Sequence, residues 1–224
     1  MKKNKKVEIK NRLNKEIKII IASLIGLSLI AIAFFWFTQI NTPMPPESII
    51  PENLTREFNH KIGPDSAKVK IVEFYDPECE ACSAFYPYVK ETIKRYEKDV
   101  QLTVRYALYH GNSLLAAKAS DAAALQGKFW NFQELLFLNQ HEWSHKNESS
   151  ISFFVKYAQD LELDISKFKA DIEDPSRIES INIDIEDGKK LGVNGTPTIF
   201  VNGKKLLNIS PSSFQELVEL ELKK

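Results

Sequence analysis

The hydrophobic pattern divides the chain near residue 38. Residues 19–37 contain no charged side chain, and residues 1–18 carry eight Lys or Arg against two acidic residues. A helix of that apolar length is about 28 Å long at 1.5 Å per residue, which matches a hydrocarbon core of about 30 Å. The pattern therefore predicts a single-pass transmembrane anchor at 19–37 in the cell membrane. The basic N-terminus at 1–18 would be cytoplasmic and the remainder extracytoplasmic, either periplasmic or outer.

A cleavable signal peptide is the alternative for the same segment. Its apolar region would be shorter and would end at small residues. Here Ala31-Ile32-Ala33 is followed by four aromatic residues, so cleavage after about Ala33 is the less favoured interpretation. Residues 38–62 hold four prolines and are predicted to form a stiff, extended tether.

Beyond the tether, the pattern first indicates two strands with a helix between them. Residues 68–75 are apolar on both faces, as in a central strand that is covered on each side. Apolar positions then recur at helical spacing from Cys82, and Pro87 lies within this helix. Residues 101–109 alternate as a second strand.

The C-terminal half is predicted to contain a helical block, a hairpin and a closing helix. Helical spacing dominates residues 113–190, where helices are predicted from 113 to 125, from about 129 to 136, at 151–159 and around 178–185. A hairpin follows, with Asn202-Gly203 as its two-residue turn, and Ser210-Pro211 is a typical helix start. These elements predict one α/β domain over residues 63–224. Charge adds little, because 30 basic and 30 acidic residues balance, which argues against a nucleic-acid partner.

The two cysteines of the chain, Cys79 and Cys82, form a C-x-x-C pair. A bond between them closes a very small ring and constrains little of the chain, so the pair is expected to react rather than to staple the fold. A structural zinc site would need two more Cys or His ligands, and the chain has only four histidines and no other cysteine. A redox-active disulfide without metal or other cofactor is therefore predicted, with a zinc site and an inert pair as the alternatives.

The predicted helix start assigns different roles to the two thiols. A thiolate at a helix N-terminus faces unpaired N–H groups and the positive end of the macrodipole. Cys79 is therefore expected to have a lowered pKa and to be the nucleophile. Cys82, one turn later, is placed to displace whatever becomes bonded to Cys79 and is the resolving thiol.

A second motif has to be considered, because residues 141–145 read His-Glu-x-x-His. On a helix this spacing provides two zinc ligands and a general base. Lys146 follows, where zinc proteases usually have an uncharged residue, and no third ligand helix is apparent. The histidines are therefore interpreted as surface loop residues, with a metalloprotease as a minor alternative.

The chain resembles the DsbA-like thiol-disulfide oxidoreductases of the thioredoxin superfamily, in particular their membrane-anchored members. Three segments carry the resemblance: the strand and C-x-x-C at 72–82, Gln126-Gly127-Lys128-Phe129-Trp130, and Gly192-Val193-Asn194-Gly195-Thr196-Pro197-Thr198. The resemblance implies a thioredoxin-like fold with a helical insertion at about 113–190.

The resemblance also implies roles for residues outside the pair. Pro197 matches the cis-proline loop that lies against the dithiol, where the backbone of Thr196 would pair with an extended substrate chain. Glu73 matches a buried carboxylate under the active site that takes part in proton transfer at the resolving thiol. The alternatives are an ordinary trans proline and a strand carboxylate paired with a lysine.

The motif departs from the family between its cysteines. Strongly oxidising members have a Pro-His dipeptide there, and this chain has Glu80-Ala81, with Glu78 just before the pair. Negative charge opposes the Cys79 thiolate, so the disulfide should be less oxidising and the direction of electron flow stays open.

The expected function is membrane-anchored thiol-disulfide exchange on extracytoplasmic proteins, in the disulfide-forming direction. The partners would be proteins that carry thiols or disulfides, and a membrane redox protein that reoxidises the pair. The alternatives are a reductase or isomerase that uses the same site, and a non-redox chaperone-like binding module.

Overall fold

The structure is a computed structural model that describes residues 26, 28, 32 and 51–224. The predicted anchor at 19–37, apart from three of its residues, and the first part of the tether lie outside the described residues. In the described part of the chain, no helix is both long enough and apolar enough to cross a membrane. The chain divides into two units, Met1–Glu47 and Ser48–Lys224, and the second is described below.

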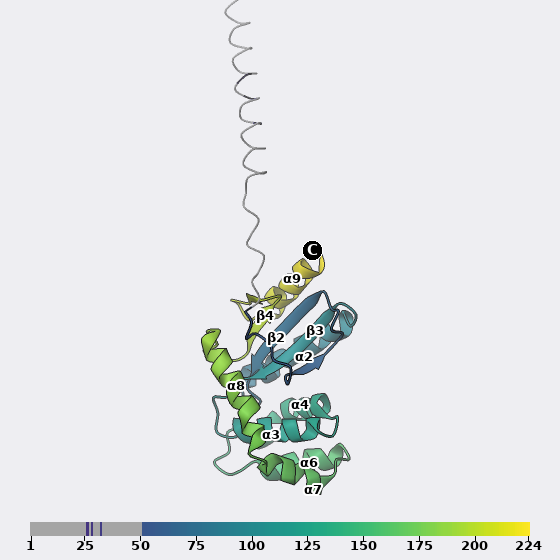
Figure 1. The fold of residues 1–224 in the computed structure, drawn as a ribbon, viewed down its shortest axis with the longest axis vertical. Coiled ribbons are helices and arrows are strands. Elements are labelled where there is room, and N and C mark those ends of the chain that lie inside the picture. The colour runs from purple at the N-terminus through teal and green to yellow at the C-terminus, as the bar shows by residue number, and fades with distance from the viewer. Residues whose placement is uncertain (1–25, 27, 29–31, 33–50) are drawn as a thin grey trace, which may run out of the picture. The chain divides into compact units, whose positions relative to one another are not determined.

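A five-stranded mixed sheet forms the centre of the domain (Figure 1). Its order is β1-β3-β2-β4-β5. The central strand β2 pairs in parallel with β3 and antiparallel with β4, while β1 and β5 pair antiparallel at the two edges. The strands are β1 His60–Ile62, β2 Val69–Tyr75, β3 Val100–Tyr106, β4 Thr198–Val201 and β5 Lys204–Lys205.

Both faces of β2 are buried, as its apolar sequence predicted. Ile71 belongs to the cluster that α2 (Glu80–Arg95) and α9 (Pro211–Leu222) help to form. Val72 and Phe74 belong to a second cluster on the opposite side. Ser210 caps α9 by accepting a hydrogen bond from Ser213 N–H at 3.2 Å. Successive residues of a strand point to opposite faces, so Glu73 shares the α2 face with Ile71.

The predicted helical block forms a separate layer beyond one end of the sheet (Figure 1). It has its own core, built around Phe132, Trp143 and Phe154. The sequence pattern predicted most of its helices but missed two of them, the short α5 and α7. The helices are α3 Ser113–Ala124, α4 Phe129–Leu138, α5 Gln140–Trp143, α6 Ile151–Asp160, α7 Ile165–Glu173 and α8 Ser176–Lys190.

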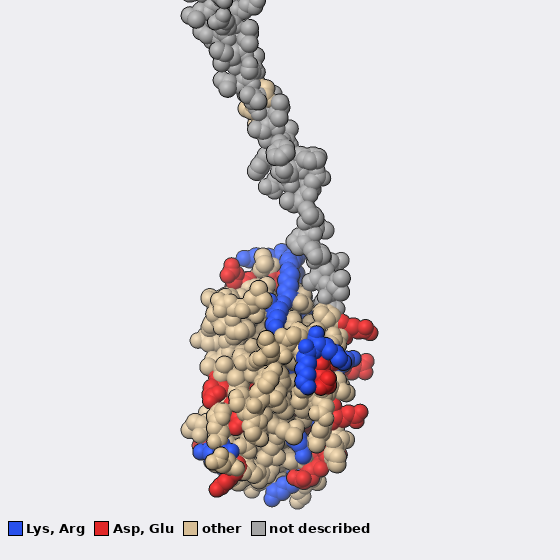
Figure 2. All heavy atoms as spheres, turned by 90° about the vertical axis from the view of Figure 1, so that its left-hand side faces the viewer, with Lys and Arg blue, Asp and Glu red and all other residues tan. Residues whose placement is uncertain are grey.

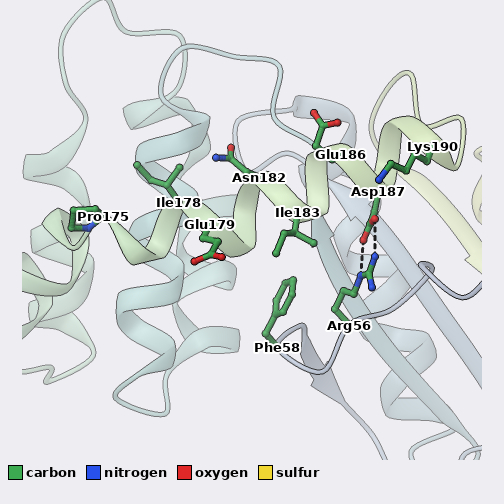
Figure 3. Close-up of a pocket in the computed structure, with 10 residues that line it drawn as sticks. All are labelled: Arg56, Phe58, Pro175, Ile178, Glu179, Asn182, Ile183, Glu186, Asp187 and Lys190. Atoms are coloured by element: carbon green, nitrogen blue, oxygen red, sulfur yellow. Dashed lines mark hydrogen bonds and ion pairs between the residues drawn. The ribbon is translucent and has the colours of Figure 1, made fainter.

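Helix α8 runs from this helical layer back along the sheet (Figure 1), where an ionic cluster holds it. Figure 3 shows one part of this cluster, the Arg56–Asp187 pair. Arg105, a fully buried residue of β3, donates to Asp184 at 2.7 Å and to Asp187 at 2.8 Å. Arg56 donates a second pair of hydrogen bonds to Asp187. The Arg105 guanidinium also donates to the carbonyl of Leu54, so one side chain ties β3, α8 and the incoming chain together.

The folded unit therefore begins before residue 63, which corrects the predicted end of the tether. Leu54 is buried in the cluster on the α8 face, and His60–Ile62 adds an edge strand to β3. The sequence did not reveal this, because a three-residue strand is too short to show a period. The predicted α/β fold with its helical insertion is otherwise confirmed.

Acidic and basic side chains are interspersed on the face of the domain shown in Figure 2, and neither sign forms one continuous patch there.

Candidate active site

Strand β2 leads directly into the cysteine pair. Asp76-Pro77-Glu78 connects it to Cys79, which is the N-cap of α2 with extended backbone angles. Cys79 is 8% exposed and Cys82, one turn into the helix, is fully buried. Both thiols are free, so the structure represents the reduced state.

Cys79 has the electrostatics of a nucleophile. Its pKa is lowered to about 5, first by hydrogen bonding from the Cys82 thiol and then by Thr196 and by the backbone N–H groups of Cys82 and Ala81. Burial acts in the opposite direction and is outweighed. The first turn of α2 therefore stabilises a thiolate at its N-terminus, as expected for a helix end.

Cys82 lies in the opposite environment, together with Glu73. Burial, the nearby Cys79 and the charge of Glu73 raise the pKa of Cys82. Burial also raises the pKa of Glu73 to about 8, and the described residues offer its carboxyl group no hydrogen-bond partner. We call Glu73 and Cys82 the floor of the site, because both lie beneath Cys79 on the buried side of α2.

The loop before β4 forms another wall of the site. The Thr196–Pro197 peptide bond is cis. The Cys79 thiol donates to the carbonyl of Thr196 at 3.4 Å, so the loop lies directly against the nucleophile. The structure thus brings Glu73, Cys79, Cys82, Thr196 and Pro197 into one site.

A set of hydrogen-bonded polar residues surrounds the other side of the pair. Asp76 is fully buried, and its carboxyl oxygens accept from four groups on two segments of the chain. The donors are Glu78 N–H at 2.8 Å, Tyr109 N–H at 2.6 Å, His110 Nδ1 at 2.8 Å and Ser113 Oγ at 2.5 Å.

Glu78 is also buried and accepts backbone N–H groups from Asn112 and His145, both at 2.6 Å. Its carboxyl group therefore joins the loop before α3 to the loop after α5. We call Asp76, Glu78, His110, Ser113 and His145 the rim of the site.

The sequence interpretation did not connect the two histidines of the rim with the dithiol, and it treated His145 only as a surface loop residue of the His-Glu-x-x-His segment. His110 lies in the loop between β3 and α3, and His145 follows α5, so both are far from the cysteines in sequence. His145 Nε2 lies 2.6 Å from a carboxyl oxygen of Glu80, the residue after Cys79, and the two imidazole rings meet edge to face at 5.4 Å. Nothing in the sequence tied either histidine to the dithiol.

The His-Glu-x-x-His segment does not have the geometry of a zinc site. Helix α5 ends at Trp143, and His145 has a left-handed backbone with φ of 52°, so His141 and His145 do not share one helix face. Within the described residues, no three His, Cys, Asp or Glu side chains are grouped to hold a metal ion.

A groove of about 810 Å³ lies apart from the cysteines, along α8 (Figure 3). Phe58 faces Ile183 across it, and the Arg56–Asp187 ion pair closes one end. None of the residues of the floor or the rim lines this groove, so it is a separate feature of the surface.

Solved structures with the same fold include several oxidoreductases. Oxidised BdbD from Bacillus subtilis is 26% identical, with a TM-score of 0.67 over 74% of this chain and 94% of that one. Alpha-DsbA1 from Wolbachia pipientis is 21% identical with a TM-score of 0.69, covering 76% and 94% of the two chains. A thioredoxin-like oxidoreductase from Silicibacter pomeroyi is 24% identical with a TM-score of 0.63, covering 81% and 99%. The chain thus has the fold of DsbA-type thiol-disulfide oxidoreductases.

Curated relatives carry another name. The chain is 28% identical over 190 residues to the Na(+)/H(+) antiporter NhaA of Herminiimonas arsenicoxydans, matching 85% of this chain and 29% of that protein. It is 33% identical over 154 residues to the Na(+)/H(+) antiporter NhaA 3 of Salinispora tropica, matching 66% and 22%. The chain therefore spans less than a third of the length of these relatives. The family model described as Thioredoxin matches residues 55–220, most of the folded unit, and the chain belongs to this thioredoxin family.

Proposed function

We propose that this protein is a thiol-disulfide oxidoreductase that forms disulfide bonds in other proteins. The observation that carries the proposal is the asymmetry of the cysteine pair. Cys79 stands at the N-terminus of α2 with a pKa of about 5, whereas Cys82 is buried with a raised pKa. A low-pKa thiol that contacts the cis-proline loop is suited to attack and to leave, and its buried partner is suited to close the disulfide.

The exchange begins from the oxidised pair. A substrate thiolate attacks Cys79 Sγ, the Cys79–Cys82 bond breaks, and its electron pair stays on the Cys82 sulfur. That sulfur takes a proton, for which the protonated Glu73 carboxyl group is the suitable donor. A second substrate thiolate then attacks the substrate sulfur of the mixed disulfide, and Cys79 leaves as a thiolate. The substrate loses two electrons and two protons. The pair gains both electrons and, through Glu73, one proton at Cys82, and the other proton is released to solvent because Cys79 stays a thiolate.

The low Cys79 pKa favours the oxidising direction. Only the reduced protein contains the thiolate, so each interaction that stabilises the thiolate favours the reduced form and makes the disulfide a stronger oxidant. Glu80 and Glu78 were expected to oppose this. In the structure, Glu78 accepts backbone N–H groups and Glu80 contacts His145, so both carboxyl groups are engaged by donors.

We further propose that residues 19–37 anchor the protein in the cell membrane, with the domain on the extracytoplasmic side. The apolar length and the basic flank of this segment support that placement. Reoxidation would then require an electron acceptor of the quinone-linked membrane class, which the anchor would hold at high effective concentration.

The test is a thiol-exchange assay with a reduced, unfolded protein that contains two cysteines. The oxidised protein should convert it to the disulfide form, as measured by the loss of free thiols. Cys79→Ser and Cys82→Ser should each abolish the conversion, because neither can form the Cys79–Cys82 disulfide. Cys82→Ser, when it is offered the disulfide form of the substrate, should accumulate a mixed disulfide: the Cys79 thiolate attacks one substrate sulfur and the other leaves as a thiolate. Ser83→Ala is the matched control on the same helix turn and should retain exchange.

A second measurement separates a disulfide-forming enzyme from a reductase. The reduction potential of the pair, measured at equilibrium with glutathione, should lie nearer −120 mV than −270 mV. A value near −270 mV would point to a reductase instead. Equal function of wild type and Cys79→Ser would overturn the redox proposal in favour of a chain-binding module.

A further inference from the structure

Two carboxyl groups that flank the nucleophile each hold an imidazole ring. Asp76, three residues before Cys79, accepts from His110 Nδ1 at 2.8 Å. Glu80, the residue after Cys79, lies 2.6 Å from His145 Nε2. The rings meet edge to face with their centroids 5.4 Å apart. Two loops that are distant in the sequence thus place histidines side by side over the start of α2.

The rim leaves these rings little freedom to move away. Asp76 is fully buried, and it accepts from the backbone of Tyr109 as well as from His110. The backbone N–H of His145 donates to the buried Glu78 at 2.6 Å. The His110 ring, the Tyr109 backbone and the His145 backbone are thereby tied to the segment that leads into Cys79. The N–H of Cys79 itself donates to the Asp76 carbonyl at 3.1 Å.

We propose that His110 and His145 are positioning residues of the reaction, which stabilise the Cys79 thiolate when their rings are protonated. They would supply from two loops the positive charge that Glu80-Ala81 does not place between the cysteines. The inference rests on the proposed function, because it explains how this site becomes oxidising.

The charges around His110 favour the protonated form of its ring. Burial lowers the pKa of His110, but its hydrogen bond with Asp76 and the charges of Asp76, Cys79 and Glu78 outweigh burial and raise it. Because coupling between two charges is mutual, the Cys79 thiolate that favours the imidazolium is itself favoured by it. The titratable groups around the two rings are Asp76, Glu78, Cys79, Glu80, Tyr109 and the partner histidine.

The pH dependence follows from these signs. Cys79 titrates near pH 5, below the raised pKa of His110, so the imidazolium is present where the thiolate forms. Above the His110 pKa the ring is neutral and its contribution disappears. The contribution of the imidazolium to the reduction potential of the pair should therefore disappear as the pH rises through the pKa of His110.

Two variants remove the charge and keep the hydrogen bonds. In His110→Asn, the amide Nδ2 can replace Nδ1 as donor to Asp76, and in His145→Gln, Nε2 can replace the ring Nε2 toward Glu80. His141→Gln is the matched control, because His141 is exposed on α5, only four residues before His145. The readout is the thiolate absorbance of the reduced protein against pH, which needs no substrate.

We expect each variant to raise the Cys79 pKa by about half a unit or more, and His141→Gln to leave it unchanged. The reduction potential of His110→Asn should lie below that of wild type at pH 6, and the gap should close by about pH 9, where imidazole is neutral. An unchanged Cys79 pKa in both variants would overturn the inference. A gap that persists at pH 9 would also overturn it, because a purely structural role does not titrate.

The outcome is separable from that of the proposed function. If the wild type fails to oxidise thiols but its Cys79 pKa still depends on His110, the proposed function alone fails. If exchange occurs with a Cys79 pKa that ignores both histidines, only this inference fails. Should His110→Asn not fold, His145→Gln carries the same test.

Discussion

The floor and the rim of the site both contain buried acidic side chains, but these side chains differ in their hydrogen bonding. Glu73 has no hydrogen-bond partner for its carboxyl group among the described residues, and burial raises its pKa to about 8. Asp76 and Glu78 are more deeply buried, yet each accepts two or more hydrogen bonds from neighbouring loops. A buried acid without donors favours its neutral form and can move a proton, whereas one with several donors organises the chain around it. The carboxyl group of the floor is therefore suited to proton transfer, and the carboxyl groups of the rim are suited to holding the loops around the site.

The largest effect should come from removing the ionisable group of the floor. The folded protein binds the Glu73 proton up to about pH 8, and the unfolded chain releases it near the ordinary value of 4.5. Wild-type stability should therefore fall as the pH rises from about 5 to 8. Glu73→Gln removes this loss and should be more stable than wild type at pH 8, by up to about 4 kcal/mol.

Urea unfolding at pH 5 and pH 8 measures this effect. The advantage of Glu73→Gln should be small at pH 5 and grow with pH, while Glu97→Gln, at an exposed position on the same domain, should show no such trend. An advantage independent of pH would mean that Glu73 is not protonated in the folded protein.

Removing a carboxyl group from the rim should lower the stability of the protein. Asp76→Ala removes the acceptor that four donors share, including the backbone N–H groups of Glu78 and Tyr109. The buried hydroxyl of Ser113 keeps only the longer hydrogen bond to Glu78 at 3.4 Å. We expect a loss of about 3 kcal/mol in the free energy of unfolding at pH 7, measured in urea. Asp76→Asn keeps the shape and one acceptor oxygen, and should lose less. A loss below about 1 kcal/mol in Asp76→Ala would remove the distinction between rim and floor.

A smaller loss of stability is expected when a neutral side chain that supports the segment before α2 is removed. The buried Gln140 amide donates to the carbonyl groups of Pro77 at 2.9 Å and Cys79 at 3.1 Å. Gln140→Ala should cost about 1 to 2 kcal/mol, because two carbonyl groups lose their donor. Gln159→Ala, at an exposed position on α6, is the matched control for thermal unfolding and should change little. Equal losses in both variants would show that Gln140 adds nothing specific to the site.

The cysteine pair was predictable from the sequence and the rim was not. Cys79 and Cys82 lie on one helix turn, so their spacing alone places them together, and Glu73 was expected beneath them from the resemblance to the DsbA-like family. The contacts of the rim join Asp76 and Glu78 to residues about 30 to 70 positions away. Such contacts are created by tertiary packing, and the periodicity of a sequence does not reveal them.

The same distinction explains the elements that were missed. The long apolar strand β2 and the hairpin with Asn202-Gly203 can be recognised from their own residues. The edge strand β1 is defined only by its pairing with β3. Helix α7 was within reach, since Asp164 caps it through Lys167 N–H, and Phe168 and Ile172 follow at helical spacing. The sequence interpretation placed helices at 151–159 and around 178–185 and left the residues between them unassigned.

The ionic cluster under α8 also decides how the domain would bear a mechanical load. A pull on the chain from the N-terminal side reaches Leu54 before it reaches β1. The carbonyl of Leu54 is bonded to Arg105, which lies on an interior strand and is locked to Asp184 and Asp187. Force would thus pass into the middle of the sheet and along α8, bypassing the three-residue edge strand.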